Sequence, residues 1–174
     1  EILVKRRNAV NYENMSLAVA NLLANAAGST STYEISTMRF GNGGTSIDGV
    51  GAVTYKATNT NSASGALYNQ THSQTVDDAI TSSALNSVTA SHTTPNTYSD
   101  VITTCTLDYN IPAGQDLTDT GTDMNGAYVF DELALYTANN DLLTHVVFHP
   151  VQKSANRKIQ VVYTLRIRSS FADL

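Results

Sequence analysis

The apolar residues near the N-terminus follow the spacing of a helix. Between residues 11 and 27 they recur three or four positions apart, which is the period of an amphipathic α-helix. Asn11 can cap its start and Gly28 suits the position after its end. We therefore expect a helix at residues 11–27 whose apolar stripe packs against a sheet. The stripe consists of Met15, Val19, Leu22, Leu23 and Ala26.

After residue 28 the apolar positions alternate with the period of two that is typical of β-strands. The alternation is clearest in residues 98–109 and 158–168, where Val162 is the exception. A turn at residues 137–141 joins two more strands into a predicted hairpin. In residues 98–109 we expect one buried face, made of Val101, Cys105, Leu107 and Tyr109. The predicted strands are 33–40, 50–56, 67–76, 85–93, 98–109, 128–136, 142–148 and 158–168.

Strands at hairpin spacing behind one helix predict a mainly β fold. We expect an antiparallel β-sandwich of jelly-roll-like form with one N-terminal helix, and a small barrel is the alternative. A length of 174 residues suits one domain with one sizeable core. We therefore expect residues 1–174 to form a single domain that begins with an arm at residues 1–10.

Charged residues make up only 14% of the chain, against about 25% in typical domains. Short uncharged side chains, mainly Ser, Thr and Asn, take their place. Covering such a surface costs little rotamer entropy and little charge hydration. The composition therefore favours burial in an assembly, although a secreted β-domain would share it.

The ten basic residues all lie in two end blocks, residues 1–56 and 153–174. Between these blocks the chain carries ten acidic and no basic residues, a formal charge of −10, so the ends with ten basic and five acidic residues carry +5. Such polarity lets copies pair an acidic face with a basic one; the alternative is acidic loops beside strands with basic outer faces. The candidate interface residues are Lys5, Arg6, Arg7, Lys158, Arg166 and Arg168.

The basic cluster near the N-terminus could contact nucleic acid. The acidic interior would repel phosphate over a Debye length of about 8 Å, so we expect no nucleic-acid partner. No apolar run approaches the roughly 18 residues of a membrane span, and we expect no membrane partner either.

Two acidic patterns resemble catalytic or metal sites but lack their context. Asp119-Thr120-Gly121 spells the aspartic-protease triplet, yet it lies in a polar loop rather than at the end of an apolar strand. Asp116, Asp119 and Asp123 do not have the spacing of an EF-hand. We interpret both as parts of a solvated loop.

The histidines, glycines and cysteine also predict structure rather than chemistry. His145 and His149 lie on a predicted strand, about 13 Å apart at the usual rise, which is too far to share a zinc ion. Residues 41–45, Gly-Asn-Gly-Gly-Thr, lack the ending of a phosphate loop, and we expect a tight turn with positive φ. Cys105 has no histidine nearby in sequence and should pack as a small hydrophobe. We predict no catalytic residue, no metal and no cofactor.

Several phrases of the chain resemble a group of tailed-bacteriophage virion structural proteins. They are MRFGNGGT at 38–45, LYNQT at 67–71, YVFDELALY at 128–136 and LLTHVVFHPVQKSANR at 142–157. The resemblance implies a β-sandwich of the virion, located in the neck, tail, fibre attachment or capsid surface. It implies a homo-oligomer that contacts other virion proteins, and it transfers no functional residues.

Three functions follow from these observations. The first is a non-enzymatic virion protein of the neck or tail, acting as connector, collar or fibre attachment. The second is a capsid decoration protein. The third is a carbohydrate-binding β-sandwich module, against which the absence of Trp counts, because sugar sites usually present aromatic platforms.

Overall fold

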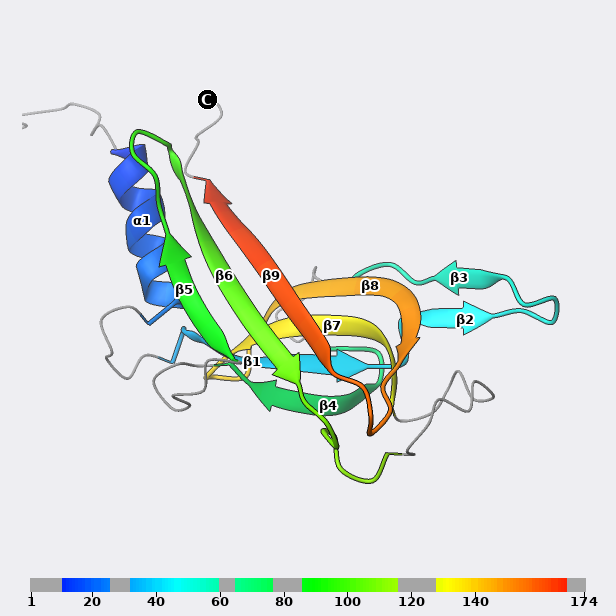
Figure 1. The fold of residues 1–174 in the computed structure, drawn as a ribbon. Coiled ribbons are helices and arrows are strands. Elements are labelled where there is room, and N and C mark those ends of the chain that lie inside the picture. The colour runs from blue at the N-terminus through cyan, green and yellow to red at the C-terminus, as the bar shows by residue number, and fades with distance from the viewer. Residues whose placement is uncertain (1–10, 26–31, 60–64, 77–85, 116–127, 169–174) are drawn as a thin grey trace, which may run out of the picture.

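The computed structural model describes residues 11–25, 32–59, 65–76, 86–115 and 128–168, and Figure 1 shows their arrangement. One helix precedes nine strands in the described part of the chain. The elements are α1 (Tyr12–Leu23), β1 (Ile35–Gly41), β2 (Thr45–Ile47), β3 (Val53–Tyr55), β4 (Gln70–Thr75), β5 (Ser87–Ser91), β6 (Tyr98–Leu107), β7 (Val129–Thr137), β8 (Leu142–Gln152) and β9 (Ile159–Arg168).

The strands form two packed sheets and one separate ribbon. The first sheet has the order β4-β1-β7-β8, the second has the order β5-β6-β9, and β2 pairs with β3. All these pairings are antiparallel. The predicted fold class, mainly β with packed antiparallel sheets and one helix, is therefore confirmed.

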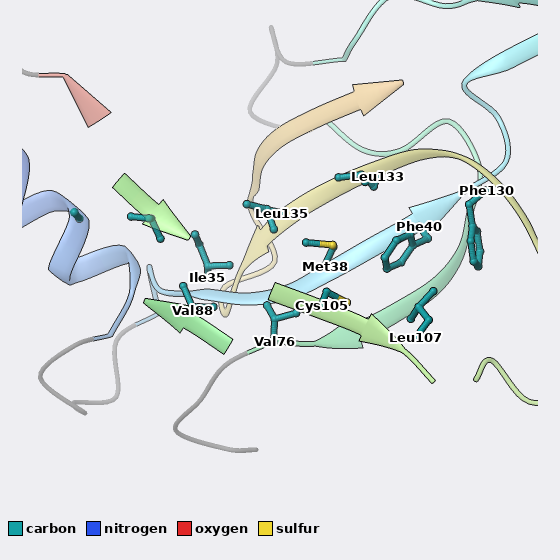
Figure 2. Close-up of a cluster of buried hydrophobic side chains, with 12 residues drawn as sticks. Ile35, Met38, Phe40, Val76, Val88, Cys105, Leu107, Phe130, Leu133 and Leu135 are labelled. Atoms are coloured by element: carbon teal, nitrogen blue, oxygen red, sulfur yellow. The ribbon is translucent and has the colours of Figure 1, made fainter. Parts of the chain in front are cut away.

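The core lies between the two sheets, as Figure 2 shows. Phe40 of β1 and Phe130 of β7 pack with their rings tilted and the ring centroids 5.1 Å apart. From the second sheet, Cys105 and Leu107 of β6 are completely buried against them. The predicted inward face of this strand is confirmed, but not at Tyr109, which lies beyond the end of β6 and is 54% exposed.

Strand β7 is buried along its whole length, unlike a strand with one face to solvent. It lies between β1 and β8. Leu133 and Leu135 join the main core, whereas Ala134 and Tyr136 pack with Leu67 in a second cluster. Its register with β8 shifts between Phe130 and Glu132. Both faces of β7 are thus covered, and its polar residues must find partners inside the protein.

Helix α1 begins as predicted and ends earlier. The Asn14 N–H donates to the Asn11 side chain over 3.0 Å, which satisfies one of the first-turn N–H groups. Ala24 caps the C-terminal end, and Asn25 adopts a φ of 50°. Asn tolerates this left-handed conformation. The helix therefore ends at Leu23, and the predicted cap at Gly28 lies outside the described residues.

The helix packs on a different face from the one predicted. It contacts β5, β6 and β9, but its fully buried residues are Ser16 and Ala20. The Ser16 hydroxyl lies 3.0 Å from the Ser99 hydroxyl of β6. These small side chains let the helix lie close to the sheet, so three members of the predicted stripe stay outside. Met15, Val19 and Leu22 are 48%, 37% and 50% exposed.

Candidate interaction surface

Of the predicted basic interface residues in the C-terminal segment, Arg166 and Arg168 lie on the exposed face of β9, and Lys158 directly precedes this strand. Arg166 donates to both carboxylate oxygens of Asp100, over 2.8 and 2.9 Å. Its guanidinium also lies 4.0 Å from the ring centroid of Tyr98. The ammonium of Lys158 lies 2.7 Å from a carboxylate oxygen of Asp108. Two of the three basic side chains are therefore matched by carboxylates of their own sheet.

These pairings change how the basic strand can act. The Arg166 guanidinium lowers the pKa of Asp100, and the Lys158 ammonium lowers the pKa of Asp108. Both carboxylates therefore stay ionised further into acid and keep their basic partners engaged. Arg168 is exposed at the end of β9. The predicted cluster at residues 5–7 lies outside the described residues.

A second surface is the ribbon β2–β3, which projects from the sandwich in Figure 1. Its large apolar side chains are exposed: Ile47, Val50 and Tyr55 are 43%, 90% and 52% exposed. The Asp48 carboxylate accepts from the Val50 and Ala52 N–H groups and closes the turn. The sequence predicted one strand here, at residues 50–56, and missed β2 because three residues show no alternation.

Asp131 of β7 fastens the base of this ribbon. Its carboxylate accepts from the Gly44 N–H over 2.9 Å and from the Thr45 N–H over 2.7 Å, and it also accepts from the Thr45 hydroxyl. Asp131 itself is 3% exposed. The ribbon thus starts from a position that buried hydrogen bonds define.

Next to it, Glu132 joins three chain segments. Its Oε1 accepts from the N–H groups of Gly43 and Asn69, over 3.2 and 2.8 Å. Its Oε2 accepts from the Tyr68 N–H and lies 3.0 Å from Nε2 of His145. Both the Glu132 and His145 side chains are 0% exposed. A buried carboxylate needs such donors, because an unpaired charge is strongly unfavourable there.

The backbone defines which ring nitrogen of His145 carries the proton. The Asn59 N–H donates to Nδ1 over 2.8 Å, so Nδ1 is the acceptor. Nε2 then carries the proton and donates to Glu132. His145 is therefore a buried, hydrogen-bonded histidine, and His149 contacts a different group, with its Nδ1 3.3 Å from the Tyr55 hydroxyl. Through its bonds to Asn59 and Glu132, His145 of β8 links the segment before residue 60 to β7.

The glycines at residues 41–44 are required by close approach. None has a positive φ, so that part of the prediction is wrong. A Cβ on Gly41 would lie 2.5 Å from Glu132 Oε1, and one on Gly43 would lie 2.7 Å from the Tyr68 Cβ. The absence of side chains lets the loop come close enough to donate to both carboxylates. We name Asp131, Glu132, His145 and the loop 42–45 the anchor cluster.

Sequence reasoning missed the anchor cluster, although a signal was present. Asp131 and Glu132 interrupt an otherwise apolar strand, and a carboxylate in such a strand must be hydrogen-bonded when buried. The glycine-rich segment supplies the backbone N–H groups that donate to these carboxylates. The sequence alone could not place these segments, 87 residues apart at Gly44 and Asp131, in contact.

Three comparisons with known proteins found no match: a scan against models of protein families, a search of curated proteins and a search of solved structures.

Within the described residues no helix is long and apolar enough to cross a membrane. No group of three or more His, Cys, Asp or Glu side chains there could hold a metal ion. Asp116, Asp119 and Asp123 lie outside the described residues.

Proposed function

We propose that this chain is a non-enzymatic structural protein of a tailed-bacteriophage particle, located in the neck or tail region. It associates with copies of itself and packs against other virion proteins. The observation that carries the proposal is the β2–β3 ribbon, which presents exposed apolar side chains from a buried, hydrogen-bonded base.

An isolated two-stranded ribbon is at best marginally stable in water. Here Asp131 and Glu132 hold its base, whereas Val50 at the tip is 90% exposed. A defined base lowers the entropy that a partner must remove on binding. Exposed apolar side chains then gain the most when a partner covers them. The ribbon is therefore suited to insertion into a groove of another protein.

The resemblance to virion structural proteins and the low content of charged residues support the same function. The resemblance includes residues 38–45 and 128–136, and these two segments meet in the anchor cluster. The quoted phrases thus coincide with the residues that hold the ribbon. A chain with only 14% charged residues also loses little charge hydration when its surface is covered.

The test is particle assembly with a variant ribbon tip. Val50→Asp places a charge at an exposed position, so the chain should fold, with an unchanged circular dichroism spectrum. We expect the wild-type chain in purified particles by mass spectrometry and the Val50→Asp chain at a much lower level. Gly49→Ala is the matched control, because a Cβ there meets nothing within 4 Å. Absence of the wild-type chain from purified particles would refute the proposed function.

Purified chain and particle density address the remaining alternatives. Light scattering should give a mass above that of one chain, whereas a monomer at every concentration contradicts self-association. Density for the sandwich on the capsid shell, rather than at the neck or tail, would instead identify a decoration protein.

A further inference from the structure

The edge of β9 opposite β6 has no strand partner among the described residues. Strand β9 pairs with β6 in one unbroken register, from Ile159 opposite Leu107 to Arg168 opposite Tyr98. Along its other edge, every second residue directs a backbone N–H and C=O outward. Figure 1 shows β9 at the margin of its sheet. Such an edge is a template for another strand.

The other edge strands carry features that limit further pairing. Strand β5 has five residues, and β4 has six, with a register shift opposite Phe40 and Gly41. Strand β8 contains Pro150, and the ribbon β2–β3 contacts it. By contrast, β9 has ten residues, no Pro or Gly, and no register shift. Of the described edges it is the best suited to pairing.

Charge does not protect the middle of this edge. Arg166 is held by Asp100 of β6, and Lys158 by Asp108 just after the end of β6, on the side away from the edge. From residue 160 to residue 165 the sequence Gln-Val-Val-Tyr-Thr-Leu carries no charge. Val162 is 61% exposed on the outer face.

The inward face of β9 is incompletely covered as well. Its side chains pack against the core but remain only partly buried, whereas Val101, Cys105 and Leu107 on neighbouring β6 are completely buried. A strand added beside β9 would cover this row. The partly buried residues are Ile159, Val161, Tyr163, Leu165 and Ile167.

We propose that β9 pairs antiparallel with β9 of a second copy, about a twofold axis at Thr164. The inference rests on the self-association in the proposed function and assigns its surface. The β5-β6-β9 sheets of the two copies then join into one continuous sheet across an isologous interface.

Like charges on opposed side chains disfavour two neighbouring registers. A twofold axis at Val162 would place Lys158 opposite Arg166 of the second copy. An axis at Tyr163 would place Lys158 opposite Arg168 of the second copy. Like charges directly opposite each other are unfavourable.

Centring on Thr164 avoids both clashes. It sets Val162 opposite Arg166 of the second copy, and Gln160 opposite Arg168. On the inner face, Tyr163 meets Leu165, an aromatic–aliphatic pair of the kind that stabilises antiparallel sheets.

The first test is cross-linking of the full chain. Opposed residues in an antiparallel pair have Cα atoms about 4.5 to 5.5 Å apart, within the range of a disulfide. Thr164→Cys should therefore form a disulfide-linked dimer under mild oxidation. Gln160→Cys is the control on the same face, because two copies of residue 160 would lie about 27 Å apart. The native Cys105 is buried and gives little background.

The second test places a charge of either sign opposite Arg166 of the second copy and measures whether the dimer persists. Val162→Lys faces Arg166 of the second copy and should shift the mass in light scattering from two chains to one. Val162→Glu faces the same group and should keep the dimer. Both substitutions are at an exposed position, so folding should persist by circular dichroism.

Failure of this inference differs from failure of self-association. If light scattering shows an oligomer that Val162→Lys leaves intact, or if Gln160→Cys cross-links as well as Thr164→Cys, the β9 pairing is wrong and self-association stands. If the wild-type chain is a monomer at every concentration, both are wrong.

Discussion

Glu132→Gln is the sharpest test of the anchor cluster, because the amide has nearly the shape of the carboxylate but different hydrogen-bonding groups. Each carboxylate oxygen accepts from two donors: Oε1 from Gly43 and Asn69, and Oε2 from Tyr68 and His145. An amide replaces one acceptor oxygen with an NH₂ group. Whichever way the amide is turned, two donors lose their acceptor and face another donor.

His145 cannot relieve this conflict by moving its proton. Transfer of the proton to Nδ1 would set that N–H against the Asn59 N–H, which already donates to Nδ1. Each buried donor left unsatisfied costs about 1 to 3 kcal/mol. Since some of the donors are only partly buried, we expect a total loss of about 2 to 4 kcal/mol, against a typical stability of about 5 to 15 kcal/mol.

The assay is urea unfolding followed by far-ultraviolet circular dichroism, which suits a chain without Trp. Glu132→Gln should lower the midpoint strongly, and Glu132→Ala should lower it further, because it leaves all four donors unsatisfied. Glu13→Gln is the matched control on a side chain that is 30% exposed, and it should have much the smaller effect. Equal midpoints for Glu132→Gln and Glu13→Gln would refute the reasoning.

Three further predictions concern the loop, the core and the outer face. Gly43→Ala should lower the free energy of unfolding by about 1 to 3 kcal/mol, because its Cβ would lie 2.7 Å from a neighbouring Cβ; Gly49→Ala should match wild type in the same urea titration. Cys105 should resist thiol reagents at pH 8 in the folded protein and react fully in denaturant, because burial raises its pKa to about 12; rapid labelling of folded protein would contradict this. Arg166 lowers the pKa of Asp100 below its usual 3.8, so the pair stabilises the fold above that value and the stabilisation is lost as pH falls through the lowered pKa. Asp100→Asn should therefore reduce stability at neutral pH and weaken its acid dependence, and an unchanged pH profile of the thermal midpoint would contradict this.

The sequence was sufficient to locate strands with one exposed face. Residues 158–168 alternate because Lys158 and Arg166 face solvent while Tyr163 and Leu165 face the core, and this period can be read without a structure. The hairpin of β7 and β8 was predictable for another reason, since polar residues mark the turn between two apolar runs.

The helix face was not predictable from apolar spacing. Met15, Val19 and Leu22 form the most regular stripe, yet Ser16 and Ala20 are buried. Their small size permits close packing on β6, which depends on the shape of the sheet rather than on the helix sequence. The prediction that the helix packs on a sheet was right, and its orientation was wrong.

The anchor cluster depends on contacts between distant segments. Glu132 is recognisable as an acidic residue in an apolar strand, but its donors come from residues 43, 68 and 69. A hydrogen-bond set of this kind arises only when the fold brings those loops together. The charge of Arg166 likewise did not show that Asp100 of the adjacent strand pairs with it, and its place in an interface stays a prediction.

The most direct test of the proposed function is a map of the intact particle by electron cryomicroscopy. We expect density for the β-sandwich at the neck or tail, with the β2–β3 ribbon and Val50 at its tip against another virion protein. A particle map in which every density is assigned to other chains would contradict a structural role in the virion.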